Sequence, residues 1–185
     1  MKTLFRIRAF GRTQKGLTLV ELIVAIAISA LIGTVVVTGV FQIIKINAKS
    51  TNRQIAISQV QNAVNSISRD AEQAQQISPT SFSLSTGGSL TMQWTTWGDQ
   101  TASPPTSPQH YVVVYSILST NLQRTITVDS GAASTTVIAN SINAASGTWN
   151  ASTKVLNFTA LTAAVGTTNT VTETRTFQIN PRSAQ

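Results

Sequence analysis

The chain has 185 residues and no cysteine, which excludes disulfides and thiolate metal ligands, so packing alone must hold its folded part. Its formal net charge is +7, but five of the 13 basic residues lie in the first 15 positions, and all six acidic residues lie beyond them. Without that segment eight basic and six acidic residues remain, a net charge of +2. We therefore expect no nucleic-acid partner.

The chain opens with a basic segment and continues as a long apolar run. Residues 1–15 carry five basic residues and no acidic one, as in the n-region of an export signal. Residues 17–44 contain one ionisable side chain, Glu21. As a helix this run would be roughly 42 Å long, which exceeds the roughly 30 Å hydrocarbon core of a membrane. A carboxylate in such a helix costs a few kcal/mol, so Glu21 predicts a functional site with a cationic partner.

A peptide-bond cleavage would create that partner. Gly16 stands in front of the apolar run, and no convincing signal-peptidase pattern of small residues follows it. Cleavage between Gly16 and Leu17 would remove the basic segment, keep the helix and leave a free amine on Leu17. This amine and the Glu21 carboxylate carry opposite charges one helical turn apart. Each can also pair with the same groups of a neighbouring chain.

At Gly16, Leu17, Thr18, Leu19 and Glu21 the sequence resembles the type IV pilins and type II secretion pseudopilins. The resemblance implies cleavage after Gly16 by a prepilin peptidase and N-methylation of Leu17. It also implies assembly with other pilin or pseudopilin subunits through the helix, on an inner-membrane assembly platform, with Glu21 and Leu17 setting the register. The sequence departs from the family in having Leu17 where phenylalanine is commonest. It also has Thr38 and Gly39 where many major pilins carry a kinking proline.

The order of the parts predicts an α+β pilin fold, in which a long N-terminal helix packs on a C-terminal antiparallel sheet. We expect a removed leader (1–16), a helix in the membrane or filament core (17–44), an amphipathic helix half (45–78) and an extracytoplasmic β-rich domain (79–185). The single span would lie in the cytoplasmic membrane, with basic residues inside and the β domain outside. The subunit would then move to a pilus or pseudopilus at the cell envelope or surface.

Residues 45–78 show helical periodicity that ends at Ser78-Pro79, because proline disfavours α geometry in the residue before it. A polar patch at 47–52 predicts a loose turn. The apolar stripe, with spacings of three and four, consists of Ile57, Val60, Val64, Ile67, Ala71 and Ala74, while Asn62, Asn65, Arg69 and Glu72 fall outside it.

The remaining chain is rich in threonine, serine and asparagine and contains short β-branched runs. Gly87-Gly88 suggests a hairpin between runs at 81–85 and 89–95. Residues 98–109, with three prolines, predict a loop. Further strands are expected at 110–118, 122–129, 135–139, 154–161 and 170–179.

A second, scattered resemblance is to the J-type minor pseudopilins. It rests on Ser68 to Ala74, Tyr111 to Tyr115, Leu122 to Arg124 and Thr176 to Arg182. It implies a minor subunit near a filament tip or in an initiation complex. Arg69 and Asp70 are adjacent on a helix and do not face each other, which favours a solvated Arg69 over a bridge.

No pattern predicts an enzyme, a cofactor or a metal site. His110 is the only histidine, no nucleophile elbow surrounds a serine, and no glycine-rich phosphate loop occurs. Asp99, Asp129 and Glu173 are isolated, which does not support a calcium site. The two N-x-[ST] patterns at Asn150 and Asn157 are expected by chance in such a composition. Core or sheet-edge packing of the tryptophans is favoured over a sugar-stacking surface made of Trp94, Trp97 and Trp149.

Three alternatives to a minor subunit stay open at this point. The first alternative is a major pilin, the second is a tip adhesin or DNA-uptake pilin, and the third is a signal-anchored surface domain that never polymerises. Exposure of the three tryptophans together would favour the adhesin.

Overall fold

The structure is a computed structural model that describes residues 16–84, 87–97, 107–167 and 170–181. By internal contacts the chain divides into two compact units, Met1–Lys45 and Ile46–Gln185. One helix, α1 (Leu19–Gln73), contributes to both units.

The strands all follow α1, which confirms the predicted α+β order. They are β1 (Gln76–Ser78), β2 (Ser81–Ser83), β3 (Ser89–Thr96), β4 (Gln109–Leu118), β5 (Asn121–Val128), β6 (Ser134–Ala139), β7 (Ile142–Asn150), β8 (Val155–Val165) and β9 (Val171–Ile179).

The helix differs from expectation at two places. It runs unbroken through the polar patch at 47–52, so the predicted loose turn is wrong. It also ends at Gln73 rather than at Ser78. The reason is β pairing, because the Gln75 N–H donates to the Gln93 carbonyl at 2.8 Å, and the Gln75 side-chain amide bonds both backbone groups of Thr95 at 3.3 Å. Residues 76–78 then pair with β3 as a strand.

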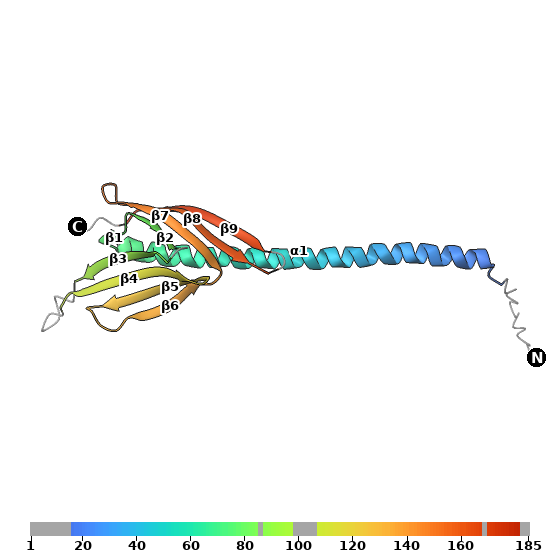
Figure 1. The fold of residues 1–185 in the computed structure, drawn as a ribbon, viewed down its shortest axis with the longest axis horizontal. Coiled ribbons are helices and arrows are strands. Elements are labelled where there is room, and N and C mark those ends of the chain that lie inside the picture. The colour runs from blue at the N-terminus through green and yellow to red at the C-terminus, as the bar shows by residue number, and fades with distance from the viewer. Residues whose placement is uncertain (1–15, 85–86, 98–106, 168–169, 182–185) are drawn as a thin grey trace, which may run out of the picture. The chain divides into compact units, whose positions relative to one another are not determined.

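Instead of one sheet, the described strands form two, and every pair is antiparallel. The five-stranded sheet has the order β1-β3-β4-β5-β6, and the four-stranded sheet has the order β2-β7-β8-β9. Figure 1 shows the sheets on opposite sides of the C-terminal part of α1, with β3 to β6 on one side and β7 to β9 on the other. The domain after Ile46 therefore consists of one helix packed against two sheets, with one face of the helix exposed.

Local turn signals predicted some pairings and missed others. The β4–β5 hairpin is confirmed, with Ser119 at φ 59° in its tight turn. The hairpin proposed around Gly87-Gly88 is wrong, because β2 pairs with β7 while β3 pairs with β1 and β4. The two runs thus enter different sheets.

Strand β7 was not predicted, since its small residues show no clear alternation. The structure explains why one of these residues, Gly147, is a glycine. A Cβ on Gly147 would lie 2.2 Å from the Asn157 carbonyl oxygen and 2.6 Å from the Phe82 ring. The glycine lets the Phe82 ring lie against the strand, where it packs edge-on to Phe158 with ring centroids 5.0 Å apart.

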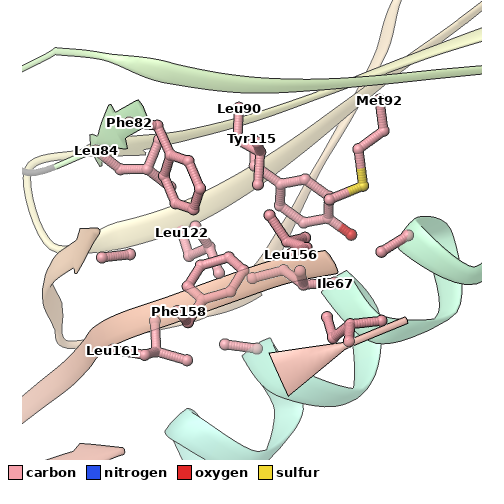
Figure 2. Packing of buried hydrophobic residues seen from close by; sticks show 14 of the residues in the cluster. Ile67, Phe82, Leu84, Leu90, Met92, Tyr115, Leu122, Leu156, Phe158 and Leu161 are labelled. Atoms are coloured by element: carbon pink, nitrogen blue, oxygen red, sulfur yellow. The ribbon is translucent and has the colours of Figure 1, made fainter. Parts of the chain in front are cut away.

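One hydrophobic core joins α1 and both sheets. In Figure 2, Ile67 of the helix faces Leu156 and Phe158 of β8 on one side and the Tyr115 ring of β4 on another. The predicted apolar stripe is present but turned slightly, because Ile57 and Val64 are only half-buried. The buried helix and post-helix residues are Ala56, Val60, Ala63, Ile67, Asp70, Ala71 and Ala74, and Asn62, Asn65, Arg69 and Glu72 are exposed as predicted.

Candidate functional site

The predicted processing site lies at the beginning of α1. Gly16, Leu17 and Thr18 precede the helix and are not helical. Both residues of the Gly16–Leu17 peptide bond are exposed, and nothing lies within 4 Å of the position a Gly16 Cβ would take. A protease therefore has steric access to this bond in a non-helical segment.

Thr18 and Glu21 form a reciprocal cap on the helix. The Glu21 N–H donates to Thr18 Oγ1 at 3.3 Å, and Glu21 Oε2 accepts from the Thr18 N–H and from Thr18 Oγ1, both at 3.1 Å. This is a capping box, which satisfies two backbone donors that a helix N-terminus otherwise leaves free. The Thr-x-x-Glu spacing was visible in the sequence, where Glu21 was interpreted only as an assembly residue.

The cap uses one oxygen of the Glu21 carboxylate. Glu21 Oε1 makes no hydrogen bond within the part of the chain that the structure describes. A carboxylate has room for further donors on each oxygen. Glu21 can thus cap its own helix and still accept from a cation outside it.

Beyond the cap, α1 presents apolar side chains on all sides. The large hydrophobic residues from Leu17 to Ile46 are half or more exposed. The hydroxyls of Thr34 and Thr38 donate to the carbonyls of Ala30 and Thr34, at 2.9 and 2.8 Å, so they are satisfied inside the helix. Internal satisfaction is what an apolar surrounding demands of polar groups. By length and composition α1 is able to cross a membrane.

A second polar cluster lies at the other end of α1. Asp70 is 5% exposed, yet its carboxylate is fully engaged. Oδ2 accepts from the Tyr115 hydroxyl at 2.5 Å and from Arg124 Nε at 2.6 Å, and Oδ1 accepts from Arg124 Nη2 at 3.0 Å. A bidentate arginine and a phenol thus tie the helix to β4 and β5.

The electrostatics of this cluster follow from burial. Burial raises the pKa of the Tyr115 hydroxyl far above its ordinary value, and the neighbouring Asp70 charge raises it further. The hydrogen bond to Asp70 raises the pKa of Arg124. Sequence reasoning correctly left Arg69 exposed but missed Asp70, whose signal was an acid at a stripe position, three residues after Ile67 and four before Ala74.

The remaining candidates do not converge. His110 is exposed. Its backbone N–H donates to Asp129 Oδ1 at 2.6 Å, and its ring Nδ1 lies 3.3 Å from Thr95 Oγ1. Trp94 is buried and stacks on Tyr111, Trp149 is half-buried, and Trp97 is exposed. Asp99 lies outside the described residues. Among the described residues, no group of three histidine or acidic side chains lies close enough to hold a metal.

Comparison with protein families finds one match. Residues 11–37 match the Prokaryotic N-terminal methylation motif. Comparisons with curated proteins and with solved structures gave no match. The motif, its apolar helix and the α+β architecture support membership of the type IV pilin and type II secretion pseudopilin family. They indicate a structural, processed subunit and fit membrane anchoring.

The Asp70 cluster generates a stability prediction. Arg124→Met removes the guanidinium and leaves a buried carboxylate with Tyr115 alone, so we expect the free energy of unfolding to fall by about 3–5 kcal/mol. Urea unfolding of the purified full chain in detergent measures it. The matched control is Arg175→Met, because Arg175 is half-exposed and its Nε lies 3.5 Å from Glu173 Oε1. This pair should contribute at most about 1 kcal/mol. Equal losses in the two variants would contradict a stabilising role for Arg124.

The raised pKa of Tyr115 generates a pH prediction. In the unfolded chain this phenol loses its proton near pH 10, whereas the folded chain retains it. Unfolding above about pH 10 therefore releases a proton, and stability falls there by up to about 1.4 kcal/mol per pH unit from this group, while below that pH its contribution is complete.

Thermal unfolding between pH 8 and pH 11 tests this. Tyr115→Phe should lower the stability at pH 8 and reduce the loss of stability at alkaline pH. The control Tyr111→Phe removes a hydroxyl bonded to Gln109 Oε1 and should show the same alkaline loss as the unchanged protein. An unchanged alkaline decline in Tyr115→Phe would rule out this linkage.

Proposed function

We propose that the chain is a structural subunit, of the minor class, in a type IV pilus or a type II secretion pseudopilus. The observation that carries the proposal is the long, exposed apolar segment 17–44, whose only ionisable residue, Glu21, lies about one helical turn after the exposed Gly16–Leu17 bond. A prepilin peptidase would cut this bond, and Leu17 would be methylated. Residues 1–16 would be lost, 17–44 would form the membrane or core helix, and 79–185 the external β domain.

Assembly follows from keeping that helix out of water. Its surface lies in the cytoplasmic membrane before assembly, with the β domain outside the cytoplasm. On the assembly platform it would exchange lipid for the helices of neighbouring subunits. The apolar area stays buried in both states, so the hydrophobic effect favours neither strongly. The polar groups at the helix start then determine which packing forms.

We assign the register to Glu21 and the new amine of Leu17. The capping box fixes the carboxylate of Glu21 through Oε2, and Oε1 is free to accept from the Leu17 amine of an adjacent subunit. At an effective dielectric near 20, charges 4 Å apart attract by about 4 kcal/mol before desolvation is subtracted. A wrong register strands both charges in an apolar core, at several kcal/mol per ion. Specificity of register is therefore the larger effect.

The minor, J-type assignment has one supporting contact. Three of the four stretches that resemble that type each contribute one residue to the buried cluster, namely Asp70, Tyr115 and Arg124. Because these three residues contact one another, a single structural feature accounts for the resemblance at all three stretches. The cluster ties the C-terminal end of α1 to β4 and β5. The fourth stretch, which ends at Arg182, falls partly outside the described residues.

The test must separate the charge of Glu21 from its capping role. Glutamine at the third helical position still completes a capping box but carries no charge. Glu21→Gln should leave membrane insertion unchanged and reduce incorporation into sheared filaments by about tenfold or more, which corresponds to 1.4 kcal/mol of lost pairing. Immunoblots of membrane and sheared fractions measure both. The control is Thr18→Ala, which disrupts the cap and retains the carboxylate.

Each outcome decides between the two roles. Loss of incorporation in Glu21→Gln with near-normal incorporation of Thr18→Ala supports charge pairing. The opposite pattern means that Glu21 matters as a helix cap. Normal incorporation of both variants would refute any assembly role for this carboxylate.

A further inference from the structure

The face of α1 that the sheets cover changes from apolar to cationic before Ala56. The buried residues Ala56, Val60 and Ile67 share this face, because they follow one another at helical spacing. Arg53 and Lys49 precede Ala56 by three and seven positions, which places them on the same face of the helix. Both are exposed. The face is thus apolar where the sheets cover it and cationic where that cover ends.

These two cations form a pair without a carboxylate beside it. Lys49 and Arg53 are four positions apart, so their side chains are neighbours on the helix surface. Neither forms an ion pair with another described residue, and the chain has no acidic residue between Glu21 and Asp70. Like charges at this spacing destabilise a helix. An anion that reaches both side chains would remove that repulsion.

The pair closely follows the apolar segment. Lys45 comes 28 positions after Leu17, a helical length of roughly 42 Å. A bilayer with its headgroups is about 40–45 Å thick, so a span that begins at Leu17 reaches the outer headgroups near Lys45. Lys49 follows one turn later. Because helical side chains lean toward the N-terminal end of the helix, Lys49 and Arg53 lean back toward the headgroups.

Membrane orientation does not explain cations at this position. Basic residues flanking a span are expected on its cytoplasmic side. With the β domain outside, Lys49 and Arg53 lie on the opposite side. What that side offers is the phosphate layer of the outer leaflet, and anionic lipids attract lysine and arginine next to a span.

We propose that Lys49 and Arg53 together bind the phosphate of an anionic phospholipid, such as phosphatidylglycerol, in the outer leaflet of the cytoplasmic membrane. The arginine guanidinium supplies a fork of N–H donors, and the lysine ammonium supplies a compact charge. The bound lipid fixes the depth of the helix in the membrane before assembly. This inference rests on the membrane anchoring in the proposed function and requires neither cleavage nor polymerisation.

The test compares two lipids that differ in headgroup charge. The full chain is released from detergent micelles that contain equal amounts of phosphatidylglycerol and phosphatidylcholine, and native mass spectrometry identifies the lipids that it retains. Phosphatidylglycerol should be retained at least about tenfold more than phosphatidylcholine, because each cation near an anionic surface contributes about fivefold. Added salt should reduce this preference. Inorganic phosphate at the concentration of the lipid should not displace it, since the acyl chains hold the headgroup beside the helix.

A double variant connects the preference to the pair. Lys49→Gln combined with Arg53→Gln should lower the preference about tenfold and leave membrane insertion unchanged. The matched control, Arg69→Gln combined with Lys154→Gln, also removes one arginine and one lysine that are exposed, and should retain the preference. All variants carry the same residues 1–15, so the five basic residues there contribute equally to each.

The outcomes separate this site from the proposed function. The measured masses distinguish chains that begin at Met1 from chains that begin at Leu17, so a failure of cleavage is detected independently of lipid binding. Equal retention of the two lipids, an equal loss in the double variant and the control, or displacement of the lipid by inorganic phosphate would each overturn the proposal.

Discussion

The apolar surface from Leu17 to Ile44 has no cover within the described chain, and the rest of the account depends on that exposure. Such a surface requires lipid or other helices around it at every stage. A carboxylate at its beginning is tolerable only if it is satisfied locally or paired with a cation. The capping box satisfies the carboxylate locally, and in our proposal the amine exposed by cleavage supplies the cation. In this proposal Glu21 caps its own helix before assembly and pairs with a neighbouring subunit after it.

A different constraint acts on the domain that begins at Ile46. Two sheets pack against one helix around a single core, and a buried ion pair fixes the helix against β4 and β5. A buried charge with its partners in place specifies one arrangement, because any other strands it. Asp70 thus does for the domain what Glu21 is proposed to do for the filament. Both are acids on apolar helix faces, and in our proposal Glu21, like Asp70, is satisfied in only one arrangement of its partners.

The sequence predicted what local chemistry determines and missed what distant pairing determines. The cleavage motif, the apolar run and the β4–β5 hairpin depend on residues close together in the chain, so they could be predicted from the sequence. The end of α1 is set by the pairing of Gln75 with β3, and Gly147 of β7 is required by the Phe82 ring. Both partners are remote in sequence. Asp70 was missed because Arg124, its partner, lies 54 positions away.

The central claim is that the chain is cut between Gly16 and Leu17, and trypsin provides a direct reading of it. Trypsin cuts after Lys15 and Lys45, so an unprocessed chain yields the peptide 16–45. The account predicts that mass spectrometry of the membrane-bound protein instead finds the peptide 17–45, carrying one added methyl group on its N-terminus. Recovery of the peptide that begins with Gly16 from the mature protein would contradict the account and leave a signal-anchored β domain.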